Sequence, residues 1–148
     1  MKSTDKYTIL RTFDQCVIQI EDILSDRETN NHQLFHLAKQ IMGDKFDGVY
    51  CSDDQIKLKN NQCCIVNTDS HKSRGMHWLA IYKYRNKCYV FDSFARDVRL
   101  LSRYFRHKHW INVEFNRIES YHQSNCGQLS LAWLIVFDKF KTKCIGVI

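Results

Sequence analysis

Apolar residues near the start of the chain recur at steps of three and four, the period of an amphipathic helix. Over residues 7–24 these positions carry Ile9, Leu10, Phe13, Val17, Ile20 and Leu24. A polar break over residues 25–31 follows. Apolar residues then recur at helical spacing up to Gly43, a residue type common just after a helix end. The first third of the chain therefore predicts two helices.

The middle of the chain changes to short apolar runs, as strands do. Residues 63–66 form a run suited to a buried strand, and residues 77–82 and 88–91 are rich in aromatic and β-branched side chains. The polar residues 83–87 between the last two runs predict a β-hairpin whose turn exceeds two residues. Val113 and Phe115 alternate with polar neighbours and indicate a further strand.

Two more helices are expected after the hairpin. Over residues 96–106, Val98, Leu101 and Phe105 share one helical face. Residues 129–140 are apolar nearly all round, which is typical of a helix in the centre of a fold. Helices followed by strands and one buried helix favour the α+β class.

Composition narrows the class of protein. A chain of 148 residues with 44% hydrophobic residues suits one compact domain with a real core. It has no apolar run long enough to span a membrane, so we expect no membrane partner. The N-terminus lacks the apolar region of a signal peptide, and seven cysteines are then most simply free thiols in a reducing compartment. We expect an intracellular monomer.

The net charge of +6 is concentrated in one segment. Residues 83–108 hold eight basic and two acidic residues, and the remaining charges cancel. Within this segment four arginines fall on one face of the helix expected over residues 96–106: Arg96, Arg99, Arg103 and Arg106. Such a stripe is either a solvated helix face or a set of phosphate contacts to a nucleic acid.

Three short segments carry the residue types of a nucleophilic enzyme. His77 opens one strand, Asp92 closes the next, and Cys126 stands immediately before the buried helix. A thiol at a helix N-terminus meets unpaired N–H groups, which lower its pKa, and an imidazole can accept its proton while an acid orients the ring. The alternatives are an ordinary histidine at a strand edge, a strand-terminating acid and a core thiol.

A zinc site is a weaker interpretation of the cysteines and histidines. Cys51, Cys63, Cys64, His71 and His77 are the candidates, but the chain has no pair of cysteines separated by two residues. Adjacent Cys63 and Cys64 on a strand would also point to opposite faces of the sheet. We therefore predict that the chemistry requires no metal or other cofactor.

The residues around the histidine and the acid strengthen the enzyme interpretation. An Ile-Val-Asn-Thr strand is followed by Gly75-Met76-His77-Trp78, then by a hairpin ending Cys-Tyr-Val-Phe-Asp-Ser-Phe, and later by Ser-Asn-Cys-Gly. Over about residues 33–140 the chain resembles the adenovirus protease (adenain) family of cysteine endopeptidases, in the clan of Ulp1-type SUMO proteases. The resemblance implies a papain-like core with a central, mostly antiparallel sheet, and a buried helix that starts at the nucleophile. Residues 1–32 would be an N-terminal helical extension of this single protease domain.

The resemblance also implies roles for individual residues. His77 would be the general base, Asp92 the orienting acid and Cys126 the nucleophile, while Trp78 would help wall the substrate cleft. The family places an oxyanion-hole glutamine six or seven residues before the nucleophile, where this chain has Glu119 and Ser120. The nearest glutamine, Gln123, is the candidate donor.

The expected function follows from the same resemblance: cleavage of viral structural precursor proteins, at sites with small residues near the scissile bond, during particle maturation. It implies DNA as a cofactor, with the arginine stripe as its contact, and a viral peptide as an activator. The protease would act in the nucleus or cytoplasm of the host cell, or be packaged in the virion. The alternatives are a Ulp1-type deconjugase of ubiquitin-like proteins, a YopJ-type acetyltransferase, and a nucleic-acid-binding module with a vestigial triad.

Overall fold

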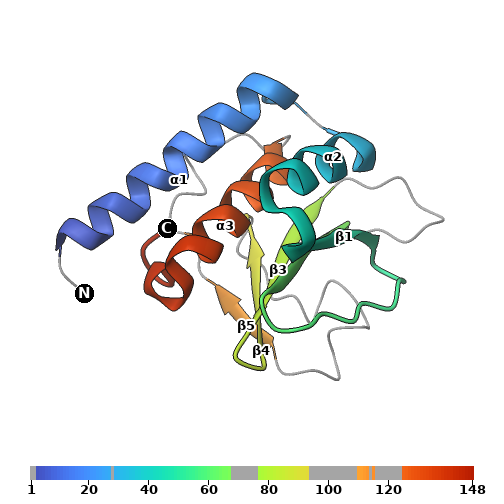
Figure 1. Ribbon diagram of the computed structural model, residues 1–148. Helices are drawn as coiled ribbons and strands as arrows, with labels where there is room; N and C mark the ends of the chain where they lie inside the picture. The colour runs from blue at the N-terminus through green and yellow to red at the C-terminus, as the bar shows by residue number, and fades with distance from the viewer. Residues whose placement is uncertain (1–2, 28, 68–76, 94–109, 114, 116–124) are drawn as a thin grey trace.

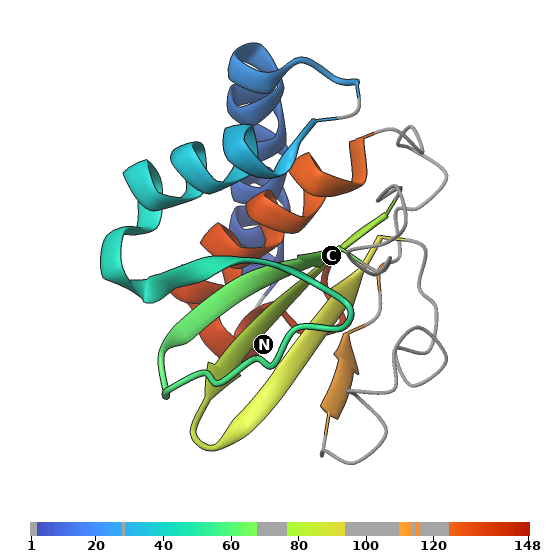
Figure 2. The ribbon, with the colours of Figure 1, turned by 90° about the vertical axis from the view of Figure 1, so that its right-hand side faces the viewer.

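Three helices cover one face of a five-stranded sheet in the computed structural model of the chain (Figures 1 and 2). The structure describes residues 3–27, 29–67, 77–93, 110–113, 115 and 125–148. The helices are α1 (Ser3–Leu24), α2 (Asn31–Met42) and α3 (Cys126–Phe140). The strands are β1 (Phe46–Cys51), β2 (Gln62–Asn67), β3 (Trp78–Tyr84), β4 (Lys87–Asp92) and β5 (Trp110–Val113). The predicted α+β class is confirmed.

The two N-terminal helices form where the apolar spacing predicts them. α1 buries Ile9, Phe13, Val17 and Ile20, one residue per turn, and this face packs along α3 (Figure 1). α2 begins with a capping box, in which Asn30 and Gln33 satisfy each other's backbone N–H groups. It ends at Gly43, whose φ of 61° favours a glycine.

The sheet is mixed rather than mostly antiparallel. The strands lie in chain order, and the inner pairs β2–β3 and β3–β4 are antiparallel, whereas the outer pairs β1–β2 and β4–β5 are parallel. A parallel neighbour needs a long return connection, and residues 52–61 supply it between β1 and β2. β1 was not predicted, because Asp47 and Gly48 interrupt its apolar pattern.

The hairpin turn has two residues, so the prediction of a longer turn is wrong. Tyr84 pairs with Lys87, which leaves only Arg85 and Asn86 between the strands, and both have positive φ, 50° and 63°. That is the backbone of a type I′ turn, and asparagine tolerates it well. Asn60 reinforces the turn through two hydrogen bonds to Asn86, at 2.8 and 3.0 Å. Lys83 and Tyr84, although polar, extend β3.

Strand residues alternate between two buried layers. On the helix face, Phe91 of β4 stacks on Trp133 of α3, with ring centroids 5.5 Å apart. On the other face, Ile56 from the β1–β2 connection covers β2 and β3. Cys63 lies in the first layer and Cys64 in the second, as the strand period predicts. The predicted buried helix over residues 129–140 is confirmed and begins three residues earlier, at Cys126. None of the described helices has the length and apolar character needed to cross a bilayer.

Candidate active site

The hairpin places His77 and Asp92 against each other at one end of the sheet. Its register pairs Asp92 with Leu79, so His77, two residues earlier, is the diagonal neighbour of the acid. The Nε2 atom of His77 lies 2.5 Å from Oδ1 of Asp92. The two side chains are 5% and 2% exposed, so the hydrogen bond is shielded from water. The carboxylate thereby fixes the orientation of the imidazole ring.

The first residue of α3 brings a thiol to the same place. The backbone N–H groups of Trp78, Gly127 and Cys126 itself lie close enough to the sulfur of Cys126 to lower the pKa of the thiol. Trp78 directly follows His77 in the chain, and the negative charge of Asp92 is close enough to act on the thiol. The start of α3, the start of β3 and the end of β4 therefore meet around one sulfur atom.

Electrostatics at the thiol differ from the expectation drawn from the helix N-terminus alone. Burial raises the pKa of Cys126, the three N–H groups lower it, and the net shift is upward. The predicted net lowering is therefore wrong for the free protein, because loss of hydration outweighs the helix end. A buried thiolate needs a positive partner, and a protonated His77 would supply it.

Gly127 explains why a glycine follows the cysteine. A Cβ atom at this position would lie 3.0 Å from Leu34 of α2, 3.0 Å from Thr29 and 3.4 Å from Trp78. The first turn of α3 is thus pressed between the start of β3 and the N-terminal helices, and only a residue without a side chain fits without a shift of its neighbours. The hydroxyl of Ser130 adds a hydrogen bond to the carbonyl oxygen of Trp78, at 3.3 Å.

Trp78 packs beside the first turn of α3. The residue is 3% exposed and belongs to the core on the helix side of the sheet. Its backbone N–H acts on Cys126 and its ring packs around Gly127. Its role in the wall of a substrate cleft stays a prediction.

Two side chains at the start of α3 form hydrogen bonds with residues 21–27, at the end of α1 and just after it. The amide of Asn125 donates to the Glu21 carboxylate of α1 at 2.9 Å. The amide of Gln128 donates to the carbonyl oxygens of Ser25 and Arg27, at 3.0 and 2.6 Å. Sequence reasoning assigned no role to these residues, because their partners lie about a hundred positions away. Both side chains are nearly fully buried.

Residues 46–147 match the family model described as adenovirus endoprotease, more than two thirds of the chain. The chain belongs to the adenovirus endoprotease family. It is therefore a viral cysteine endopeptidase, a hydrolase, as the resemblance predicted. The match begins at the first residue of β1, so α1 and α2 precede the matched region. No curated protein matches the chain.

Several predicted residues of this endoprotease fall outside the part of the chain that the structure describes. They are the oxyanion candidate Gln123 and the stripe Arg96, Arg99, Arg103 and Arg106. The helix expected over residues 96–106 lies there as well. These assignments stay predictions. All seven cysteines are described, and none forms a disulfide.

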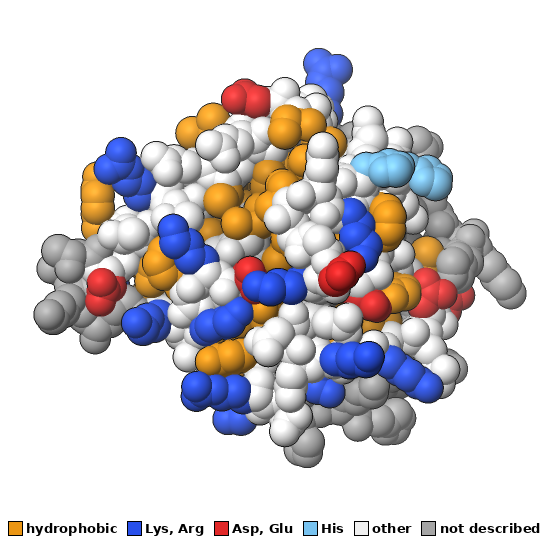
Figure 3. Space-filling model, in the orientation of Figure 1, with side chains coloured by type: hydrophobic (Ala, Val, Ile, Leu, Met, Phe, Trp, Pro, Cys, Tyr) orange, Lys and Arg blue, Asp and Glu red, His pale blue; other side chains and the backbone are white. Residues whose placement is uncertain are grey.

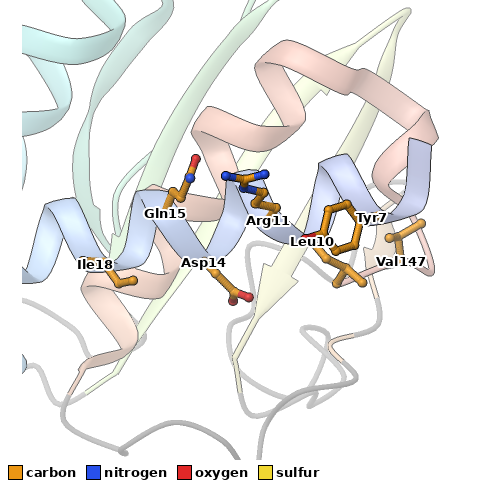
Figure 4. Close-up of a pocket in the computed structure, with 7 residues that line it drawn as sticks. All are labelled: Tyr7, Leu10, Arg11, Asp14, Gln15, Ile18 and Val147. Carbon is orange, nitrogen blue, oxygen red and sulfur yellow. The ribbon is translucent and has the colours of Figure 1, made fainter. Parts of the chain in front are cut away.

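Two apolar grooves of the endoprotease lie along α1, and neither is lined by His77, Asp92 or Cys126. One runs beside Val147, close to the C-terminus (Figure 4), and the other lies between α1 and α2. Exposed apolar side chains gather near them, between lysines and arginines (Figure 3). The exposed side chains that line the grooves are Tyr7, Ile18, Ile23 and Ile41. Neither groove contains a cysteine–histidine pair, so the described chemistry is concentrated at the start of α3.

Proposed function

We propose that Cys126, His77 and Asp92 form the catalytic triad of this endopeptidase and that it cleaves viral structural precursor proteins during particle maturation. The observation that carries the proposal is the buried hydrogen bond between His77 and Asp92 beside a cysteine sulfur close to backbone N–H groups. The acid engages Nε2 of the ring, which assigns proton exchange with the thiol to Nδ1.

The first half of the reaction forms an acyl-enzyme. His77 takes the thiol proton at Nδ1, and the sulfur of Cys126 attacks the carbonyl carbon of the scissile peptide bond. The carbonyl π electrons move to the oxygen, giving a tetrahedral intermediate. When the C–N bond breaks, the imidazolium returns its proton to the departing amine, and a thioester to Cys126 remains.

The second half regenerates the enzyme. His77 removes a proton from water, whose oxygen attacks the thioester carbon and expels the Cys126 thiolate as the acid product forms. In both halves the negatively charged oxygen of the tetrahedral intermediate needs hydrogen-bond donors. The backbone N–H of Cys126 is one donor in this proposal, and the Gln123 amide is the second.

The triad is tested by Cys126→Ala, with Cys144→Ala as the matched control. Both thiols are buried, but Cys144 lies beyond the opposite end of α3. Cys126→Ala should remove turnover of a precursor-derived peptide to the uncatalysed background, because no acyl-enzyme can form, with little change in melting temperature. Cys144→Ala should keep the wild-type kcat. Turnover retained by Cys126→Ala would overturn the assignment.

Substrate class is tested with two families of substrate on the same enzyme. Peptides with glycine or alanine flanking the scissile bond should be cleaved, because papain-like clefts of this clan are narrow. A ubiquitin-like protein carrying a C-terminal fluorogenic amide is the comparison substrate. Faster release from the ubiquitin-like protein than from every precursor peptide would favour the deconjugase function instead.

A further inference from the structure

Asn125 stands at the N-cap of α3 and does not cap it. Its φ and ψ of −104° and 20° lie outside the extended region that capping residues adopt, and its side chain makes no cap hydrogen bond. Asparagine is among the best residue types for an N-cap, and α2 of the same chain shows the usual arrangement at Asn30. The start of α3 thus departs from the local preference of its own sequence.

The partner of Asn125 lies on α1. The side-chain amide donates to the Glu21 carboxylate at 2.9 Å, and Asn125 is 1% exposed. Its Oδ1, the atom that would accept a cap hydrogen bond, is buried and has no partner among the described residues. An unsatisfied buried acceptor is unfavourable, so this orientation persists only because another contact holds it.

One of the N–H groups that a cap could occupy acts on the sulfur instead. An N-cap side chain accepts from the backbone of the second or third helical residue, which here are Gly127 and Gln128. The Gly127 N–H lies close enough to the Cys126 sulfur to lower the pKa of the thiol. An Asn125 side chain that caps the helix through Gly127 would compete with the thiol for this donor.

We propose that Glu21 is a positioning residue for the nucleophile. By holding the amide of Asn125, it prevents that side chain from capping α3 and leaves the Gly127 N–H to the Cys126 sulfur. The inference rests on the proposed role of Cys126. Glu21 precedes the region matched to the family, so the N-terminal extension is part of the catalytic apparatus in this chain.

The proposal is tested by the pH dependence of Cys126 alkylation. Iodoacetamide is applied to the full chain at a series of pH values, and the adduct at Cys126 is quantified by peptide mapping. Glu21→Ala should move the midpoint upward by about one pH unit, because the thiolate loses one N–H donor to Asn125. At neutral pH, kcat for a peptide should fall about tenfold with little change in KM.

Three further variants separate positioning from general support of the fold. Glu21→Gln keeps an oxygen acceptor and should restore the wild-type profile. Asp22→Ala removes the same charge from the next, exposed position of α1 and should change nothing. Asn125→Ala cannot cap, so adding Glu21→Ala to it should cause no further shift. If Glu21→Ala does not fold, Glu21→Met removes the acceptor with less loss of volume.

The outcomes distinguish this inference from the proposed function. The positioning role is overturned if Glu21→Ala leaves the pH dependence of Cys126 alkylation unchanged. It is also overturned if Glu21→Ala shifts this dependence equally when Asn125 is already alanine. In either case an inactive Cys126→Ala variant still supports the triad. Turnover retained by Cys126→Ala overturns both.

Discussion

The two ends of α3 differ in how completely their polar groups are hydrogen-bonded. At its start, a polar cluster is left incompletely paired: Asn125 does not cap, and Asn125 Oδ1 and Gln128 Oε1 are buried without partners among the described residues. At its other end, Asp138 accepts from the hydroxyl of Tyr82 at 2.6 Å and from both Lys45 and Lys141 at 3.2 Å. One helix therefore carries a poorly satisfied end and a well satisfied one.

At the C-terminal end of α3, Lys141 holds the last turn of the helix through several contacts. Lys141 donates to the carbonyl oxygen of Asp138 at 2.8 Å, and its own backbone N–H donates to Phe137. Its ammonium also lies 4.8 Å from the centre of the Tyr82 ring, within range of a cation–π contact. A cation at a helix C-terminus is favourable, since the last carbonyl groups carry partial negative charge.

This contrast indicates that one end of α3 contributes mainly to stability and the other mainly to catalysis. The Asp138 end ties α3 to β3 through Tyr82 and to the turn between α2 and β1 through Lys45, far from the proposed catalytic residues. The Cys126 end keeps backbone donors for a sulfur atom and, in the proposed mechanism, for an oxyanion. Substitutions at the first end should change the free energy of unfolding, and substitutions at the second should change kcat.

The largest effect expected here belongs to Asp92→Asn. Asparagine has nearly the same shape, but its amide cannot supply the negative charge that stabilises a protonated His77, and it favours the wrong tautomer. We expect kcat to fall by about 10²–10⁴-fold with KM nearly unchanged, measured on a short peptide. A variant with more than half of the wild-type kcat would remove the acid from the triad.

Gly127→Ala should produce the next largest effect. The new methyl group would lie 3.0 Å from Leu34 and Thr29, so the first turn of α3 must shift and carry Cys126 with it. We expect at least about a tenfold loss of kcat and a loss of about 1–3 kcal/mol in unfolding free energy. Gly48→Ala is the control, because its methyl group would meet only ordinary contacts at 3.5 Å. Equal kcat values for the two variants would contradict the packing argument.

Tyr82→Phe should affect stability alone. It removes the hydroxyl that donates to Asp138 and receives Lys141, while the ring still packs on Phe137. Denaturant unfolding should show a loss of about 1–3 kcal/mol, since the partly buried Asp138 carboxylate loses one of its hydrogen-bond donors. Peptide turnover by the folded variant should keep the wild-type kcat. A large fall in kcat would show that the two ends of α3 are coupled.

The smallest expected effect is a pH dependence at Asp138. Burial raises the pKa of this carboxyl, but hydrogen bonds from Tyr82, Lys141 and Lys45 outweigh it, and the pKa lies below its ordinary value of 3.8. The resulting stabilisation is complete above the unfolded-state pKa and is lost as pH falls through the lower folded-state value. Asp138→Asn should therefore flatten the decline of unfolding free energy below about pH 4. An unchanged slope would contradict this assignment.

Periodicity in the sequence was enough to predict α1, α2 and α3, and the strands β3 and β4 that position His77 and Asp92. The spacing of Ile9, Phe13, Val17 and Ile20 is a local signal, and α1 follows it. Turn length was not predictable in the same way, because Arg85 is an unusual residue for positive φ and its turn is stabilised by Asn60 from another loop.

The site could be predicted in its residue types but not in its electrostatics. His77, Asp92 and Cys126 stand out by their positions at strand and helix ends, and the structure brings their segments together. The contact of Asn125 with Glu21 joins residues 104 positions apart, which no local pattern reveals. The raised pKa of Cys126 depends on burial, and burial is a property of the assembled fold.

The central claim is that one of seven cysteines is activated by His77. A glycine-terminated peptide vinyl sulfone, followed by peptide mapping of the full chain, tests it most directly. We predict a single adduct, at Cys126, that disappears in His77→Ala while the melting temperature is retained. Cys64 and Cys144, which are also buried, should stay unmodified. An adduct at another cysteine, or equal labelling of Cys126 in His77→Ala, would contradict the account.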